Sequence, residues 1–185
     1  RSTRVRSSAA SDVYKRQCLD TATEGQVFLD GTDAAALDEE GRRRFRAEKI
    51  GLVFQQFHLI PFLTALENIM LAQHYHSVVD EAAARKVLEQ VGLGHRVTHL
   101  PSQLSGGEQQ RVAIARAVAH KPKVIFADEP TGALDTASGL NVMRLFKDLV
   151  AKEGITIVMT THDPNLMELG DVVFEIEDGE IVGKA

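Results

Sequence analysis

The chain has 185 residues, of which 44% are apolar, and a net charge of −5 at neutral pH. This length suits one domain, and the apolar fraction is high enough for a folded core, so a disordered chain is excluded. The single cysteine, Cys18, excludes an internal disulfide framework and is typical of a reducing cytosol. No apolar run approaches the about 18 residues of a membrane-spanning helix, so we expect any membrane span to belong to a partner.

Residues 1–17 differ from the rest of the chain. They hold five basic residues and one acidic residue, which leaves a net charge of −9 for the remainder. Their segment 11–17 (SDVYKRQ) resembles translated adapter sequence, so we expect a non-native or disordered leader before a domain over residues 18–185. The acidic remainder lacks a basic patch with interleaved aromatic residues, and nucleic acid is therefore not an expected partner.

Residues 24–54 predict a strand, a helix and a second strand. The first strand closes on an Asp-Gly turn at Asp30, the helix covers residues 38–49, and the apolar run 50–54 (IGLVF) predicts a buried strand. Gln55 follows that strand, and its amide oxygen is a suitable neutral ligand for Mg²⁺ or its waters. Taken alone, Gln55 would be interpreted as a surface glutamine.

A helical subdomain is predicted over about residues 62–120. Thr64 and Glu67 have the spacing of a capping box, which starts a helix that reaches about Tyr75. Residues 80–90 predict a second helix, stopped by Gly92.

The third helix of this region begins in the segment 104–111 (LSGGEQQR). Ser105 and Glu108 form another capping-box pattern, while Gly106 and Gly107 would let an anion approach the amides at the positive end of the helix. The pattern Ser-x-x-Glu alone favours an ordinary capped helix. The whole string predicts a phosphate-binding helix start.

Two further apolar runs predict buried strands that end in polar side chains. The run 124–127 leads into Asp128 and Glu129, and alternation along a strand lets one carboxylate face Mg²⁺ while the next faces water. The run 155–160 leads into His162, which we expect beside Glu129 because ligands bind outside the carboxyl ends of parallel strands. Alone, the acidic pair would suggest a solvated turn, and the histidine a structural hydrogen bond.

The remaining patterns complete an α/β fold. A crossover helix between these two strands is predicted from apolar residues at helical spacing, and residues 172–182 predict a hairpin around an Asp-Gly turn. The crossover residues expected to pack on the sheet are Leu140, Met143, Phe146, Leu149 and Val150.

These segments together resemble the nucleotide-binding subunit of ABC transporters from Cys18 to about Lys184. The resemblance implies a P-loop NTPase-like ABC ATPase fold, with a mostly parallel sheet, flanking helices, a helical signature subdomain and an antiparallel β portion. Details around the Gln55 and Glu129 segments look like the lipoprotein-release and macrolide-export subgroup. The matching positions are Gln55 (Q-loop), Leu104, Ser105, Gly106, Gly107, Glu108 and Gln109 (signature motif), Asp128 and Glu129 (Walker B), Asp135 (D-loop) and His162 (switch histidine).

The resemblance implies ATP and Mg²⁺ as cofactors, with Asp128 and Gln55 on the metal and Glu129 and His162 as catalytic residues. It implies a head-to-tail homodimer or heterodimer in which the signature motif and Asp135 meet the partner's ATP. It further implies an integral membrane permease as partner and a cytoplasmic location, peripheral on the inner face of the membrane.

One departure concerns the Walker A loop, G-x-x-x-x-G-K-[ST], which has no match here, since the first glycine is Gly25. The polypeptide of residues 1–185 is therefore expected to lack ATPase activity alone, although its signature helix could complete a partner's site. Two alternatives stay open: a soluble ABC-type protein acting on nucleic acid or translation, and a non-catalytic regulatory cassette. Glu129 argues against the second.

Overall fold

The computed structural model describes residues 26–76 and 78–184. The expected leader, residues 1–17, and Cys18 lie outside the described residues. Within the described residues, no helix is both long and apolar enough to cross a membrane.

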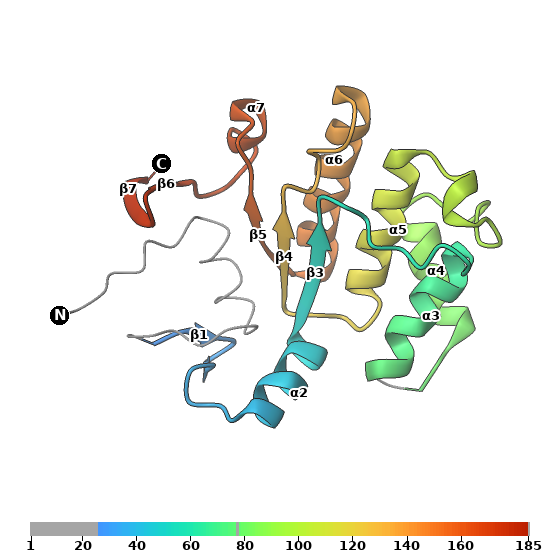
Figure 1. The fold of residues 1–185 in the computed structure, drawn as a ribbon, viewed down its shortest axis with the longest axis horizontal. Coiled ribbons are helices and arrows are strands. Elements are labelled where there is room, and N and C mark those ends of the chain that lie inside the picture. The colour runs from blue at the N-terminus through green and yellow to red at the C-terminus, as the bar shows by residue number, and fades with distance from the viewer. Residues whose placement is uncertain (1–25, 77, 185) are drawn as a thin grey trace.

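A three-stranded parallel sheet forms the centre of the molecule (Figure 1). Its strands lie in the order β3 (Ile50–Phe54), β4 (Val124–Asp128) and β5 (Thr156–Thr160), which confirms the three predicted apolar strands. The register pairs Phe54 with Asp128 and Asp128 with Thr160. The polar residues that follow these strands therefore leave the sheet at one common edge.

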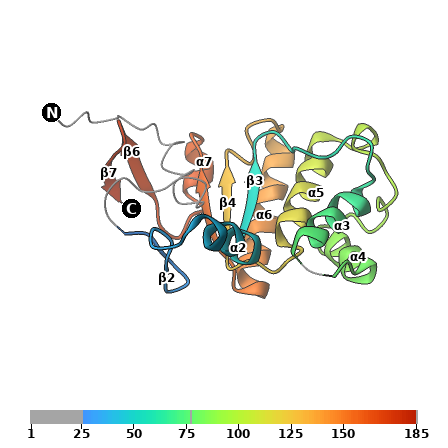
Figure 2. The same ribbon diagram turned by 60° about the horizontal axis from the view of Figure 1, so that its bottom comes forward.

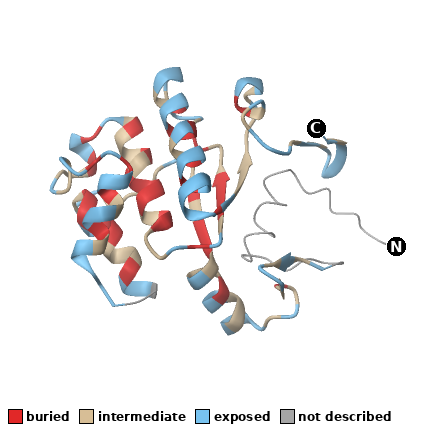
Figure 3. Ribbon diagram, turned by 180° about the vertical axis from the view of Figure 1, so that it is seen from behind, coloured by how far each residue is buried: buried red, intermediate tan, exposed pale blue. Residues whose placement is uncertain are grey.

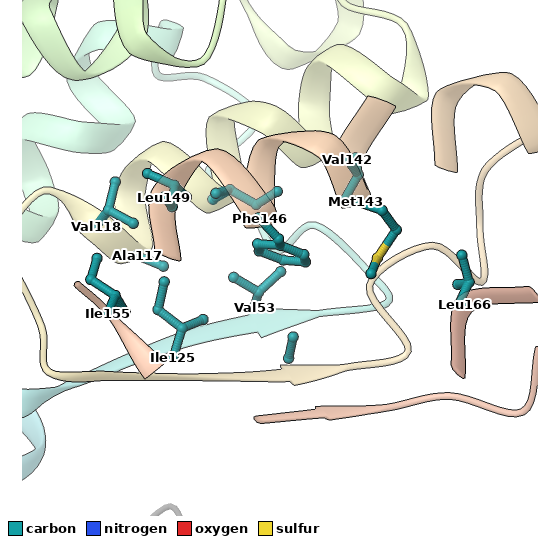
Figure 4. Packing of buried hydrophobic residues seen from close by; sticks show 12 residues of the cluster. Val53, Ala117, Val118, Ile125, Val142, Met143, Phe146, Leu149, Ile155 and Leu166 are labelled. Atoms are coloured by element: carbon teal, nitrogen blue, oxygen red, sulfur yellow. The ribbon is translucent and has the colours of Figure 1, made fainter. Parts of the chain in front are cut away.

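Helices α5 (Gly106–Val118) and α6 (Thr136–Glu153) cover one face of this sheet. Val53 and Ile125 point from the strands toward Phe146 of α6, and Met143 continues the same cluster (Figure 4). The prediction that α6 packs back on the sheet is confirmed for its central residues. It is wrong for Leu140 and Val150, which are exposed because they lie on the outer side of the helix.

The second face of the sheet is covered by α2 (Glu39–Lys49), which comes to the front in Figure 2, and by the short strands β1 (Phe28–Leu29) and β2 (Thr32–Asp33). Phe126 of β4 packs here with Phe45 of α2, since alternate residues of a strand point to opposite faces. The strand predicted over residues 24–31 is thus shorter than expected within the described residues. Its predicted turn lies at Asp30, whose carboxylate pairs with Lys49.

A second core lies between α3 (Ala65–His76), α4 (Glu81–Gln90), the 3-10 turn η1 (Pro101–Gln103) and α5. Helix α5 contributes to both cores, so it is buried on more sides than the predicted apolar stripe (Figure 3). The capping boxes predicted at Thr64 and Ser105 both form.

The C-terminal part leaves the sheet at the side opposite to α3 and α4 (Figures 1 and 2). It contains α7 (Pro164–Met167) and the predicted hairpin, formed by β6 (Phe174–Glu177) and β7 (Glu180–Lys184). These two strands are antiparallel, as the sequence predicts for the last part of the chain.

Candidate functional site

The carboxyl ends of β4 and β5 hold the first acidic side chain of the site. The Thr160 hydroxyl donates to Oδ1 of Asp128 at 2.7 Å, so Asp128 is fixed by its neighbour in the sheet. The other carboxylate oxygen of Asp128 has no hydrogen bond to any described residue. It is free to face a ligand at this edge.

Glu129 is held in a backbone conformation that residues other than glycine rarely adopt. Its φ is +42°, and its amide donates to both the carbonyl and the hydroxyl of Thr160, at 3.1 and 3.3 Å. Such strain of order 1–3 kcal/mol persists only where the surroundings impose it. The left-handed turn aims the Glu129 side chain away from the strand direction, toward the loop that follows β5.

His162 lies beside Glu129, as the sequence predicts. Its Nδ1 is 3.0 Å from Glu129 Oε1, and because an ionised carboxylate only accepts hydrogen bonds, Nδ1 is the donor. This tautomer leaves Nε2 as an acceptor, or as a second donor when the ring is protonated. The histidine side chain is 78% exposed, so that nitrogen is open to a ligand.

Gln55 reaches the same edge from the end of β3. A Cβ atom added to Gly132 would lie 2.8 Å from Gln55 Nε2 and 3.2 Å from Glu129 Oε2. Gly132 therefore separates the two side chains and leaves room for both. We call Gln55, Asp128, Glu129 and His162 the strand-end group.

The strand-end group fits a magnesium ion bound to phosphate. Mg²⁺ prefers oxygen ligands and is held by one or two protein groups when phosphates and waters complete its shell. Asp128 has one carboxylate oxygen without a hydrogen bond to the described residues, and Gln55 supplies an amide oxygen at the neighbouring strand end. Within residues 26–76 and 78–184, no group of three acidic, histidine or cysteine side chains could hold a metal by protein ligands alone.

The start of α5 forms the second part of the site. Ser105 Oγ accepts from the Glu108 amide at 3.2 Å, and Glu108 Oε2 accepts from the Ser105 amide at 2.8 Å. The amides of Gly106 and Gly107 then remain without an acceptor among the described residues, at the positive end of the helix. We call Ser105, Gly106 and Gly107 the signature turn; it is arranged to accept an anion.

The two glycines of the signature turn have different surroundings. A Cβ on Gly107 would lie 3.0 Å from Ser138 Oγ and 3.1 Å from Ser138 Cβ, whereas a Cβ on Gly106 would meet nothing closer than Leu134 Cδ2 at 3.5 Å. Gly107 thus also lies in a tight contact between α5 and α6, where a side chain would press on Ser138. The sequence predicts a ligand-binding role for Gly107 but does not predict this packing contact.

The remaining signature residues support the turn from within the chain. Leu104 is buried in the second core, and its carbonyl accepts from Gln109 Nε2 at 3.1 Å. Arg96 pairs with Glu108 at 3.1 Å. The Ser105 amide, with smaller contributions from the Ser105 hydroxyl and Arg96, lowers the pKa of Glu108, so this side chain is ionised at neutral pH.

Asp135 is the N-cap residue of α6. Its Oδ1 accepts from the Ser138 amide at 3.0 Å, and hydrogen bonds from the Ser138 side chain and amide lower the pKa of Asp135. The structure gives the residue a local role at the beginning of a helix that packs against the signature turn.

Sequence reasoning missed two residues of this site. Thr160 fixes Asp128, and Gly132 makes room for Gln55 and Glu129. Thr160 ends the predicted apolar run 155–160, but the register that places it opposite Asp128, one residue beyond the end of the run 124–127, is visible only in the folded sheet. Gly132 carries no local signal, because the side chain nearest to it, Gln55, comes from a distant segment.

Known proteins are similar to most of this chain. The family described as ABC transporter matches residues 16–132. The uncharacterized ABC transporter ATP-binding protein MJ1508 of Methanocaldococcus jannaschii is 50% identical over 167 residues, which are 89% of this chain and 74% of that protein. The macrolide export ATP-binding/permease protein MacB of Marinobacter nauticus is 44% identical over 168 residues, which are 89% of this chain and 26% of that protein.

A solved structure has the same fold. The ATP-binding cassette MJ0796 of Methanocaldococcus jannaschii, in a dimeric post-hydrolysis state bound to ADP and Pi, superimposes with a TM-score of 0.84 at 40% identity. The match covers 95% of this chain and 79% of that chain.

Proposed function

This chain belongs to the ABC transporter family of ATP-binding proteins, and from that premise we propose that it binds and hydrolyses ATP within a head-to-tail dimer that drives export or lipoprotein release through a membrane permease. The relatives favour a transporter over a protein acting on nucleic acid, since MacB is a macrolide export ATP-binding/permease protein. The observation that carries the proposal is the meeting of Glu129, Asp128 and His162 at the carboxyl ends of neighbouring parallel strands.

The strand-end group would act on the ATP carried by its own chain. Glu129 orients or deprotonates the attacking water, and His162 holds the Glu129 carboxylate while its exposed ring nitrogen reaches the terminal phosphate. Asp128 and Gln55 would hold Mg²⁺, which when bound neutralises charge on the phosphate oxygens. The intrachain contacts support this division, since the Thr160 hydroxyl fixes the Asp128 carboxylate and His162 fixes the Glu129 carboxylate before a ligand arrives.

The signature turn would act on the ATP of a second cassette. The amides of Gly106 and Gly107, which have no acceptor in the part of the chain that the structure describes, and the exposed Ser105 suit a terminal phosphate that approaches from outside the chain. The dimeric state of the related MJ0796 cassette supports this arrangement. An identical second cassette gives a homodimer and a different one gives a heterodimer. The same geometry serves both.

The membrane partner would bind near the loop that follows Gln55, in the family's manner. This loop includes Phe57 and His58, and it is continuous with the residue that we assign to Mg²⁺. The proposed location is cytoplasmic, peripheral on the inner face of the membrane. The ATP-binding/permease name of MacB supports a permease partner for this cassette.

The polypeptide of residues 1–185 is proposed to be inactive on its own, because it contains no Walker A sequence. Its signature turn should nevertheless complete a partner's site. We expect it to restore hydrolysis when mixed with an intact related cassette whose own signature motif has been disabled. Absence of any restored hydrolysis would contradict this part of the proposal.

The decisive experiment uses a completed cassette, meaning this chain preceded by a Walker A segment from its own reading frame or from a related cassette. We expect magnesium-dependent ATP hydrolysis, measured as phosphate release, and ATP-dependent dimerisation, measured by light scattering. A completed cassette that folds but neither dimerises with ATP nor hydrolyses it would overturn the proposal.

A further inference from the structure

A buried glutamine connects α5 to two of the strand ends. Gln110 is 0% exposed, and its Nε2 donates to the Phe54 carbonyl at 3.2 Å and to the Pro130 carbonyl at 2.6 Å. Phe54 directly precedes Gln55, and Pro130 directly follows Glu129. One side-chain amide therefore holds the backbone beside two members of the strand-end group.

The two polar atoms of this amide have different surroundings. The Gln110 Oε1 atom is buried without a hydrogen-bond partner among the described residues, and an unsatisfied buried acceptor costs about 1–3 kcal/mol. An apolar side chain of the same length would avoid that cost but would leave the Phe54 and Pro130 carbonyls without the donor that positions them. The orientation of the amide is well defined, because the opposite orientation would place Oε1 against two carbonyl oxygens.

A second side chain of α5 holds the far side of Gln55. Arg116 lies further along the helix and donates to the carbonyls of Phe57 and His58. Its guanidinium remains charged at neutral pH, which strengthens both contacts. Gln55 is thus bracketed, with Phe54 before it and Phe57 after it both bonded to the same helix.

Helix α5 begins at the signature turn, and Gln110 lies in its second turn. A helix moves as a rigid element because its internal hydrogen bonds fix its shape. Any displacement of the signature turn by a bound anion would therefore act on the Phe54 and Pro130 carbonyls through Gln110. Those carbonyls in turn set the positions of Gln55 and Glu129.

We propose that Gln110 is a positioning residue that couples the signature turn, which meets the partner's ATP, to Gln55 and Glu129, which act on the chain's own ATP. This inference rests on the proposed function and adds to it a route between the two sites of the dimer. The two ends of this route act on different ATP molecules. Gln110 positions the Glu129 of its own chain, which acts on that chain's ATP, whereas the signature turn on the same helix contacts the ATP of the other chain.

The test uses Gln110→Met in the completed cassette, since methionine keeps the length and removes both donors. We expect kcat to fall roughly tenfold or more, because misplacing a catalytic group by about 1 Å has effects of that size, while KM for ATP changes less than twofold. The exposed Gln90→Met is the matched control and should leave kcat unchanged.

Mixed dimers separate positioning from general damage to α5. In both dimers one subunit carries Glu129→Gln, so only the other subunit hydrolyses ATP. When Gln110→Met is placed on the hydrolysing subunit, we expect the full loss of kcat; when it is placed on the Glu129→Gln subunit, we expect activity close to that of the dimer without it. Equal losses in both arrangements would overturn the inference, because they would mean that the substitution damages the signature turn.

A second variant keeps the inference testable if Gln110→Met does not fold. The protonated carboxyl of Gln110→Glu can still donate to a carbonyl, whereas its ionised form cannot. The kcat of this variant relative to the unsubstituted cassette should therefore rise as pH falls from about 8 to about 6, and a flat ratio would overturn the inference. If the completed cassette hydrolyses ATP and every Gln110 variant hydrolyses it equally well, the coupling is disproved and the proposed function stands. If the completed cassette itself does not hydrolyse ATP, both the proposed function and the coupling are disproved.

Discussion

The strand-end group and the signature turn are built in opposite ways. In the strand-end group, Asp128 and Glu129 are fixed by Thr160 and His162 within the same chain. In the signature turn, the capping box satisfies the Ser105 and Glu108 amides but leaves those of Gly106 and Gly107 without an acceptor among the described residues. The first group is assembled by folding, whereas under the proposed function the second is completed by another molecule.

This difference predicts which property, ATP hydrolysis or dimerisation, a substitution in each group will affect. Substitutions in the strand-end group should alter chemistry and leave association intact. Substitutions in the signature turn should alter association, provided that they do not disturb the packing of α5 on α6. The following changes in the completed cassette test this division, beginning with the largest expected effect.

Glu129→Gln removes the proposed base and keeps the size of the side chain. We expect kcat to fall by about 10²-fold or more, while ATP-dependent dimerisation persists, because the signature turn is unaffected. Phosphate release and light scattering measure the two quantities. Glu168→Gln, which removes the same charge at an exposed position, is the control. If Glu129→Gln loses dimerisation as well as hydrolysis, the two groups do not have the separate roles proposed for them.

Gly107→Ala tests the packing role and the ligand role together. The added methyl group would lie 3.0 Å from Ser138 Oγ, and overpacking of this kind costs about 1–3 kcal/mol in the free energy of unfolding. We also expect ATP-dependent dimerisation to weaken by roughly tenfold, because the methyl group narrows the anion's approach. Chemical denaturation and light scattering provide the measurements.

The double variant Gly107→Ala with Ser138→Gly separates these two roles. Adding Gly107→Ala to Ser138→Gly should cost less stability than Gly107→Ala costs alone, because the clash is removed, but dimerisation should stay weak. Gly106→Ala supplies a second comparison, since its methyl group makes only ordinary contacts, with Leu134 at 3.5 Å and Phe57 at 3.7 Å, and should impair dimerisation without unfolding the chain. Full recovery of dimerisation in the double variant would show that Gly107 is needed for packing only.

Thr160→Val removes the hydroxyl that holds Asp128 and preserves the shape of the side chain. The hydroxyl donates to Asp128 and accepts from the Glu129 amide, which keeps the Thr160 carbonyl as an acceptor, so its loss should lower the free energy of unfolding by about 1–2 kcal/mol. We expect a severalfold higher Mg²⁺ concentration for half-maximal hydrolysis, because Asp128 is then free to turn. Thr156→Val, on the exposed end of the same strand, is the control, and an equal Mg²⁺ requirement in both variants would contradict the role of Thr160.

Glu108→Gln should produce the smallest effect, and it concerns pH. The pKa of Glu108 is lowered on folding from its ordinary value of 4.5, so its carboxylate stabilises the fold above that pH and the contribution is lost as pH falls through the folded pKa. The variant should therefore lose less of its Tm than the unsubstituted cassette between pH 7 and pH 3. Glu89→Gln on α4 is the control, and parallel Tm curves for all three proteins would refute the prediction.

Local patterns predicted much of the fold because the forces behind them are local. The run 50–54 forms β3 with the predicted bounds, and the capping boxes at Thr64 and Ser105 form with reciprocal hydrogen bonds. The meeting of Glu129 and His162 was predictable as well, since parallel strands present their carboxyl ends at one edge.

Features that depend on distant segments could not be predicted in this way. Leu140 is spaced three residues from the buried Met143, yet it is exposed, because it lies on the outer side of α6. Gln110 looks like a surface residue in a polar string, and only the arrangement of β3 and the Pro130 turn around α5 buries it. The same holds for Gly107 of α5, whose neighbour Ser138 comes from α6.

The spacing of the central strands has a consequence for the order of folding. Between β4 and β5 lie 27 residues, mostly α6, whereas 69 residues separate β3 from β4. Closing the longer connection costs about 0.8 kcal/mol more chain entropy if both are flexible, and pairing over long sequence separations is slow. We expect Asp128 and Thr160 to come together early and Gln55 to join them last, so that the amide ligand arrives at an acidic pair that is already in place.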